Sequence, residues 1–245
     1  MSARRTAATA GRVLAQLRAD PRTVAMLLVV PLLLMILLRY AFDSTVLIFD
    51  HVAPILIAVF PFVLMFLVTS VAMLRERSTG TLERLLSMPI AKLDLLVGYA
   101  LAFGAVAAVQ VALVITVVLG PLGVSVSGSV IVLSLFGVLD ALLGMALGLW
   151  LSALAHTEFQ AVQLLPAVVF PQLLVCGLFA PRDNMAGVLQ GLADAFPLTY
   201  AVDGVTRAAA STAWTGSLVK DLVIVAICIP SALGLGAATL QRRTG

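Results

Sequence analysis

Long apolar stretches alternate with short polar segments along the whole chain, and the apolar stretches carry almost no charge. About 20 consecutive apolar residues cross the roughly 30 Å hydrocarbon core of a bilayer as an α-helix. The pattern therefore predicts an all-α polytopic membrane protein with six spans and no internal repeat. The predicted spans are residues 23–42, 52–74, 95–119, 130–153, 159–180 and 219–240.

Composition agrees with this pattern and excludes a soluble domain. Hydrophobic residues make up 62% of the chain and charged residues only 11%, far from the mix of a soluble globular protein. No linker divides the chain, so we expect one transmembrane domain over residues 1–245. Cys176 and Cys228 lie within apolar runs and are interpreted as buried apolar side chains, not as a disulfide. A net charge of +3 gives no reason to expect nucleic-acid binding.

The distribution of basic residues predicts the orientation. Cytoplasmic loops carry an excess of Lys and Arg. If the N-terminus is cytoplasmic, eleven of the fifteen Lys and Arg residues lie on the inner side. Only Arg39, Arg182, Arg207 and Lys220 then lie on the outer side. We therefore expect both termini and the polar segment 75–94 in the cytoplasm.

A short polar segment, residues 75–89, separates the second and third predicted spans and has the pattern of an ordered helix. Gly80 interrupts the chain, Glu83 suits the positive end of a helix dipole, and Pro89 ends the helix. Apolar residues at helical spacing give it one apolar face, formed by Leu82, Leu85 and Leu86. The prediction is a cytoplasmic amphipathic docking helix; an ordinary positively charged loop is the alternative.

Two further segments have amphipathic character. Before the first span, three apolar residues, Val13, Leu14 and Leu17, lie beside basic residues, which is typical of a helix in the inner membrane interface. The alternative is a frayed, basic N-terminal segment. Between the fifth and sixth spans, apolar residues at helical spacing and Pro197 predict two short helices over residues 184–209, dipping into the outer leaflet. A simple capping loop is the alternative. Here we expect Asp203 to hydrogen-bond to nearby backbone or hydroxyl groups.

The polar residues present argue against an enzyme. The chain has no G-x-x-x-x-G-K-[ST] phosphate-binding loop. His51 and His156 are predicted on opposite faces of the membrane, so no catalytic or metal-binding cluster is expected. Asp140 is the one acidic residue near the centre of a span, where charge is costly. We favour a neutral, hydrogen-bonded structural role beside Gly144 and Gly148, which suit close helix packing; contact with a substrate is the alternative.

Three segments resemble the type-2 permeases of ATP-binding-cassette (ABC) transporters, notably the drug-resistance exporter branch with its daunorubicin-resistance-like membrane subunits. Residues 76–89 look like the family signature E-R-x-x-G-T-x-E-x-L-x-x-x-P. Residues 151–161 are similar to the family's inner connection between spans four and five. Residues 196–204 resemble N-P-L-T-Y-A-x-D, with Phe196 in place of asparagine.

The resemblance implies roles for particular residues. It implies an N-terminal interfacial elbow helix, a cytoplasmic coupling helix between spans two and three, and short outer re-entrant helices before span six. The implied ATPase-coupling residues are Glu76, Arg77, Gly80, Thr81, Leu82, Glu83, Arg84, Leu85 and Leu86. The implied substrate path includes Phe62, Phe66, Phe170 and Leu174, with Asp140 as a further candidate. The implied outer gate comprises Phe196, Pro197, Tyr200 and Asp203.

The resemblance also implies partners and a function. Two nucleotide-binding ATPase subunits, which hold ATP and Mg, would dock beneath a pair of permeases, identical or homologous, in a bacterial plasma membrane. The apolar character of the spans favours a hydrophobic or amphipathic substrate such as a drug, an antibiotic or a lipid, exported from the cytoplasm or inner leaflet. Export of lipid-linked polysaccharide and, less favoured, ion-coupled transport are the alternatives.

Overall fold

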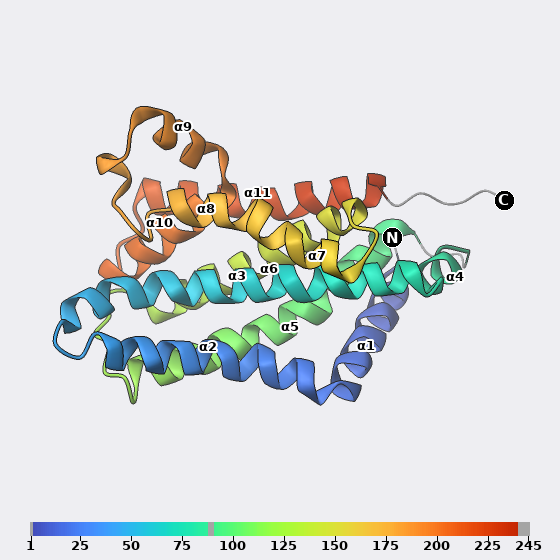
Figure 1. Cartoon of the computed structure of the whole chain (residues 1–245), viewed down its shortest axis with the longest axis horizontal. Helices are drawn as coiled ribbons and strands as arrows, with labels where there is room; N and C mark the ends of the chain where they lie inside the picture. The colour runs from blue at the N-terminus through green and yellow to red at the C-terminus, as the bar shows by residue number, and fades with distance from the viewer. Residues whose placement is uncertain (1, 88–90, 240–245) are drawn as a thin grey trace.

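The computed structural model describes residues 2–87 and 91–239, and all regular structure within these ranges is helical (Figure 1). Long helices lie side by side along the longest axis of the molecule, and short helices lie at its two ends. The α-helices are α1 (Ala3–Ala19), α2 (Pro21–Ala41), α3 (Val46–Ser78), α4 (Thr81–Ser87), α5 (Lys92–Leu119), α6 (Val130–Leu151), α7 (Glu158–Leu164), α8 (Phe170–Val175), α9 (Gly187–Ala195), α10 (Pro197–Ala210) and α11 (Gly216–Thr239).

Among the described residues, six helices are long and apolar enough to cross a membrane, as predicted. They are α2, α3, α5, α6, the continuous segment from α7 to α8, and α11. The second is longer than predicted, because α3 continues through Ser78 and so includes Glu76 and Arg77. Polar side chains carry no desolvation cost once a helix has left the hydrocarbon core, so the helix can continue beyond the span. The fifth ends at Val175, before the predicted residue 180, because Gly177 turns the chain with a φ of 100°. Residue 240, the predicted end of the sixth span, lies outside the described residues.

The centre of the bundle is the contact between α3 and α6, the most extensive in the fold. Gly144 and Gly148 let the two backbones approach closely: a Cβ atom on Gly148 would lie 2.5 Å from the Phe66 carbonyl oxygen, and one on Gly144 would overlap the Phe62 carbonyl. The predicted packing role of this small-residue pair is confirmed. Close backbone approach matters in a bilayer because dispersion forces, rather than the hydrophobic effect, hold spans together.

The fifth span is irregular. A π-helical turn, Leu165–Val169, joins α7 to α8. Pro166 lies inside that turn and Pro171 inside α8, and each removes a backbone donor from the helical ladder. Such residues commonly produce π-helical turns and kinks. The carbonyl of Val168, within this irregular part, accepts a hydrogen bond from the Gln172 side chain at 3.1 Å.

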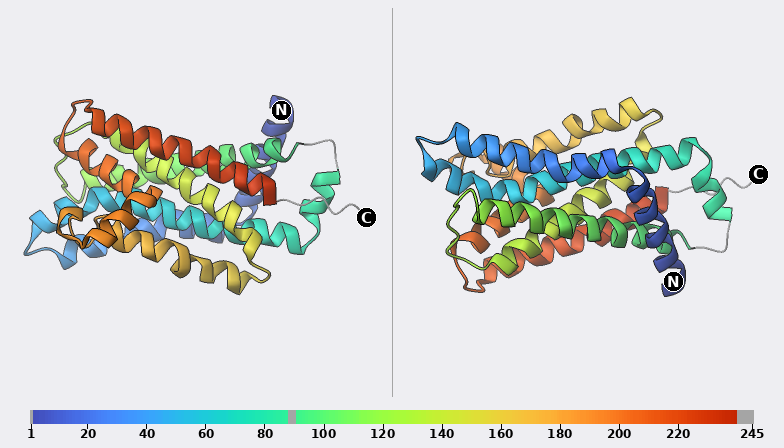
Figure 2. Two further views of the ribbon diagram at one scale, coloured as in Figure 1. Left: turned by 90° about the horizontal axis from the view of Figure 1, so that it is seen from above. Right: turned by 90° about the horizontal axis from the view of Figure 1, so that it is seen from below.

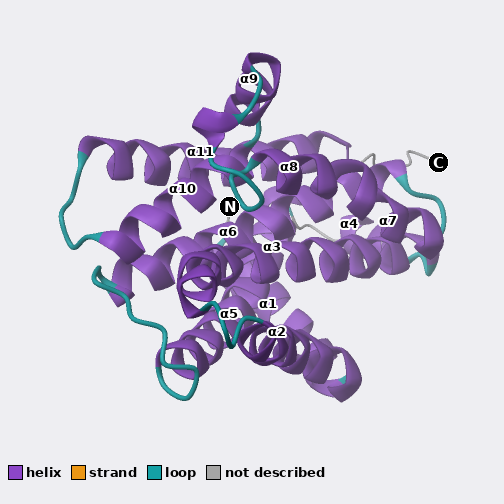
Figure 3. Cartoon of the chain, turned by 60° about the vertical axis from the view of Figure 1, so that its left-hand side comes forward, coloured by secondary structure: helices purple, strands orange, loops and turns teal. Residues whose placement is uncertain are grey.

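Two groups of short helices mark the ends of the bundle. At one end lie α4 and α1, and α1 crosses the long helices at a steep angle (Figure 2). At the other end, α9 projects away from the bundle while α10 packs against it (Figure 3). On the predicted orientation, the first end is cytoplasmic and the second is external.

The N-terminal segment is an ordered helix, not a frayed lead. Val13 is 2% exposed, and Thr9 packs so closely on α5 that a Cβ atom added at Gly98 would lie 2.6 Å from the Thr9 Cβ. The backbone N–H of Ser2 donates a hydrogen bond to Asp94 at 3.1 Å. Contacts along its length therefore hold α1 on the start of α5.

Candidate functional site

The predicted docking helix is α4, and a glycine turn sets its direction. Gly80 has a φ of 71°, in the left-handed region that suits glycine. The N–H groups of Thr79 and Gly80 donate to the carbonyls of Arg75 and Arg77 at 3.0 and 3.2 Å, closing the end of α3. The predicted break at Gly80 and the helix after it are confirmed. The predicted stop at Pro89 lies outside the described residues.

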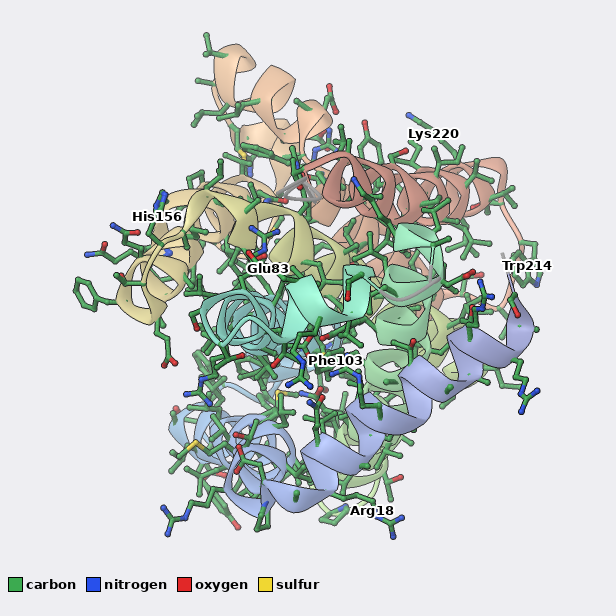
Figure 4. The ribbon with its side chains drawn as sticks, turned by 90° about the vertical axis from the view of Figure 1, so that its right-hand side faces the viewer. Arg18, Glu83, Phe103, His156, Trp214 and Lys220 are labelled. Atoms are coloured by element: carbon green, nitrogen blue, oxygen red, sulfur yellow. The ribbon has the colours of Figure 1, made fainter. Side chains whose placement is uncertain are left out.

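One side of α4 is anchored and the other is free. Leu82 is 5% exposed and joins the main apolar core, and Leu85 packs partly buried against the same core. Glu83 and Arg84 are exposed at the end of the bundle, where Figure 4 shows Glu83 on the helix in front. The hydroxyls of Thr79 and Thr81 lie 3.0 Å apart at the turn. The helix therefore presents charged groups on a rigid base. The side chain of Leu86 lies outside the described part.

Glu76 points inward and braces three helices. The Arg12 Nη1 atom donates to the Glu76 carboxylate at 2.6 Å, and Nη2 donates to the Tyr99 hydroxyl at 3.3 Å. Burial by itself lowers the pKa of Arg12, but hydrogen bonding to Glu76, together with electrostatic interactions with Tyr99 and Glu76, outweighs burial and raises it. Glu76 is only 8% exposed. Its carboxylate links α3 to α1 and α5 within the chain and is not displayed on the surface.

A second ion pair ties α3 to α7. Arg75 donates two hydrogen bonds to the Glu158 carboxylate, at 2.8 and 3.1 Å, in the fork geometry typical of arginine. Both side chains are more than half exposed, so the pair orients the helices more than it stabilises them. Arg77, on the same helix end, is half-buried.

Four of the residues in these ion pairs and hydrogen bonds were not among the predicted site residues: Arg12, Arg75, Tyr99 and Glu158. Arg75 lies at the start of the predicted polar segment 75–89. Arg12 and Tyr99 are 64 and 23 residues from Glu76 in the sequence, and no local pattern connects them. One signal was available for Glu158, because it lies in the segment 151–161 that resembles a family motif. For Arg12 and Tyr99, only the packing of α1 across α3 and α5 reveals the link.

The predicted path residues do not share one surface of the chain. Phe62 and Phe66 have no exposed surface and lie on α3 where it meets α6. Phe170 and Leu174, on α8, are 50% and 62% exposed. Asp140 is fully buried on α6, and neither carboxylate oxygen has a hydrogen-bond partner among the described residues. The hydrogen bonds that we expected for Asp140 are therefore absent among the described residues, and its neighbours in the sequence, Ala141 and Leu143, belong to the apolar core.

At the opposite end, the prediction of two short helices within residues 184–209 is confirmed by α9 and α10. Phe196 separates them and Pro197 is the first residue of α10, where its missing N–H costs nothing. The Tyr200 hydroxyl donates to the Asp194 backbone carbonyl at 2.8 Å, so it ties α10 back to α9.

Asp203 has different partners from those expected. It accepts a hydrogen bond from Arg182 at 2.8 Å and lies 3.7 Å from Arg207, rather than bonding to backbone or hydroxyl groups. Arg182 also pairs with Asp194, and Arg207 pairs with Asp221 on α11. Burial lowers the pKa of Arg182, but Asp203 and then Asp194 more than compensate and raise it. The expectation failed because Arg182, distant in the sequence, folds back onto α10.

Comparison with known proteins identifies the family. The ABC-2 type transporter family matches residues 5–209, which is most of the chain. The chain belongs to the ABC-2 type transporter family. It is 31% identical over 155 residues to the probable multidrug ABC transporter permease YbhR of Escherichia coli K12, covering 62% of this chain and 41% of that protein. It is 27% identical over 152 residues to ABC transporter G family member 20 of Dictyostelium discoideum, covering 62% of this chain and 21% of that protein.

The ABC-2 match includes both ends of the molecule described above. It begins in α1 and stops near the end of α10, so the α4 end and the outer ion pairs of Asp203 lie inside it, whereas α11 lies beyond it. A third ABC relative, the probable multidrug permease YbhS of Escherichia coli K12, is 27% identical over 165 residues, which is 67% of this chain and 44% of YbhS. The matched part of the chain thus spans less than half the length of each of these three relatives.

Proposed function

We propose that this chain is the membrane-spanning permease subunit of an ATP-driven exporter for hydrophobic or amphipathic molecules such as drugs, antibiotics or lipids. The observation that carries the proposal is α4: its apolar side is anchored in the core and its charged side is exposed at the end of α3. Multidrug permeases among the relatives support the substrate class.

In this proposal, ATP and Mg are held by two separate nucleotide-binding subunits, and this chain performs no hydrolysis. Each subunit would press on the exposed face of one α4. Because Leu82 joins α4 to the core and Arg12 and Arg75 brace the end of α3, a push on α4 would move the inner ends of several spans together. Two ATP sites that close together need two receivers, so we propose a two-fold pair of permeases, identical or homologous.

The proposed orientation places both termini and α4 in the cytoplasm of a bacterial cell, and the count of basic residues supports it. Phe170 and Leu174, exposed on α8, are proposed to face the path between the paired permeases, with α9 and α10 as the outer gate. The side chains of Phe62 and Phe66 are buried within the single chain. We therefore propose that they support the α3 side of the path from behind and do not line it directly.

The proposal is tested by separating ATP hydrolysis from transport. We expect Glu83→Ala and Gly80→Pro to leave the permease folded but to lower substrate-dependent transport at least tenfold, a loss of about 1.4 kcal/mol in coupling. Proline cannot adopt the positive φ of Gly80, so the second change redirects α4. Transport by vesicles that contain the permease and its ATPase subunit is the measurement.

Asp183→Ala is the matched control, since Asp183 is an exposed acidic residue at the opposite end of the chain. It should transport normally. Normal transport by both α4 variants at equal expression would exclude the docking role, and transport driven by a pH gradient without ATP would exclude the exporter.

A further inference from the structure

A cavity of about 540 Å³ lies between α1, α2, α3 and α5 and belongs neither to α4 nor to the predicted path. Its volume is in the range of pockets that hold small molecules. Its walls are mostly apolar and include Leu27 and Val30 of α2, Leu64 and Val68 of α3, and Phe103 of α5. Figure 4 shows Phe103 between the α1–α2 layer and the rest of the bundle.

The cavity has the length and position of one membrane leaflet. Its lining on α3 runs from Leu64 to Glu76, which is about 18 Å at 1.5 Å per residue. Half of the hydrocarbon core is about 15 Å thick. On the orientation proposed above, Arg75 marks the cytoplasmic end and Leu64 the region near the bilayer centre. The cavity also meets the outer surface of the bundle beside Met26, a lining residue that is 66% exposed.

Polar groups occur at one end only. Gln16, Asp20, Thr23, Arg75 and Glu76 line that end. The two acidic groups already have partners: Asp20 accepts from the Thr23 N–H and hydroxyl at 3.2 and 2.7 Å, and Glu76 accepts from Arg12.

Further arginines lie at or just beyond this end. Arg18 and Arg22 are exposed on the turn from α1 to α2, and Figure 4 shows Arg18 at the edge of the bundle. With Arg12 and Arg75, the four arginines outnumber the three nearby acidic groups, which are Asp20, Glu76 and the Arg75 partner Glu158. An anionic head group is therefore favoured at this level, where basic residues attract anionic lipids.

We propose that this cavity binds one acyl chain of an anionic phospholipid of the inner leaflet, with the phosphate beside Arg18, Arg22 and Arg75. The lipid enters sideways past Met26 and fills the space that α2 leaves against α3. This inference depends on the proposed orientation but not on coupling to an ATPase, because it concerns binding by the permease alone. An occupied cavity would support α1 and α3 at the level where Arg12 and Glu76 join them.

Photolabelling tests the proposal. The full chain is placed in phosphatidylcholine vesicles that contain a small fraction of phosphatidylglycerol with a photoactivatable group in its acyl chain. We expect label on residues 13–30 and 64–76. Ala72→Phe should reduce that label about tenfold, because a benzyl group at this lining position fills the cavity. Ala108→Phe is the matched control: Ala108 is an exposed alanine of α5 outside the cavity lining, so the label should persist.

Met26→Trp fills the cavity from its exposed wall and replaces Ala72→Phe if that variant does not fold. Unchanged labelling in the folded filling variants would overturn the proposal. Equal labelling by a phosphatidylcholine probe would overturn the anionic head group. Displacement of the label by a hydrophobic dye that the permease exports would show a transport site instead of a lipid site. Failure of the α4 variants to alter transport leaves this test unaffected, since no ATPase subunit is present.

Discussion

At the scale of single residues, the α4 end depends on charges that are satisfied inside the chain. Glu76 is nearly buried, and its carboxylate is neutralised by Arg12, which also donates to Tyr99. A buried carboxylate without a partner loses its hydration and gains nothing in return. The same signature motif thus contains an inward brace, Glu76, and an outward charged residue, Glu83, a few residues apart.

We predict that Arg12→Ala destabilises the protein because it leaves Glu76 unpaired. The expected loss is about 1–3 kcal/mol, the usual cost of an unsatisfied buried polar group. Thermal unfolding of the purified permease in detergent measures it. Arg4→Ala, which removes an exposed arginine from the same helix, should leave the unfolding temperature unchanged. Replacing Arg12 and Glu76 together by leucine should recover most of the loss, and a double variant as unstable as Arg12→Ala would contradict the explanation.

At the scale of elements, the contact between α3 and α6 decides where the cytoplasmic helix end is held. The two helices meet through Gly144 and Gly148 over the buried Phe62 and Phe66. Because α3 runs unbroken from this contact to Ser78, the position of α6 is transmitted to the turn at Gly80. The other spans are less buried inside the chain. In α2, only 17% of the apolar stretch is buried.

We predict that Gly144→Ala destabilises the bundle, because the added methyl group would overlap the Phe62 carbonyl and force the two backbones apart. The expected cost of such overpacking is about 1–3 kcal/mol. Gly234→Ala in α11 is the matched control, since, apart from the nearby backbone of its own helix, no atom of the described residues lies within 4 Å of the new Cβ. That change should be neutral or stabilising by up to about 1 kcal/mol. Equal unfolding temperatures for the two variants would show that α6 tolerates separation from α3.

At the scale of the whole molecule, each end of the bundle is held by its own set of ion pairs. At the α4 end, Arg12 and Arg75 join α3 to neighbouring helices. At the other end, Arg182 joins Asp194 of α9 to Asp203 of α10, and Arg207 continues the chain of pairs to α11. The large apolar side chains of α9 are exposed and only Ala193 is buried, so these pairs and the Tyr200 hydroxyl are its main polar links to the bundle.

We predict that Arg182→Gln releases α9 without unfolding the spans. Amide hydrogen exchange over residues 187–195 should accelerate at least tenfold, which corresponds to about 1.4 kcal/mol of lost protection. Exchange over α3 and α6 should not change. Asp183→Asn, on the neighbouring exposed residue, serves as the control. Unchanged exchange in α9 after loss of Arg182 would mean that its packing, rather than the ion pairs, holds it.

The helices of this protein and their breaks follow from local patterns in the amino-acid sequence. Apolar runs predicted six spans, Gly80 predicted the break before α4, and Pro197 predicted the division between α9 and α10. These features depend on hydrophobicity and backbone conformation, which act within a few residues of one another. The small-residue pair Gly144 and Gly148 was predicted for the same reason, because its spacing alone places both on one helix face.

Contacts between distant residues, in contrast, could be seen only in the folded chain. The partners of Glu76 and Asp203, the burial of Phe62 and Phe66, and the cavity beside α2 all depend on how distant helices pack. An ion pair or a cavity wall joins residues many turns apart in the sequence, and any one helix offers several exposed faces to its neighbours. The pattern of one helix says which face is apolar but not which helix covers it, and the packed bundle supplies that choice.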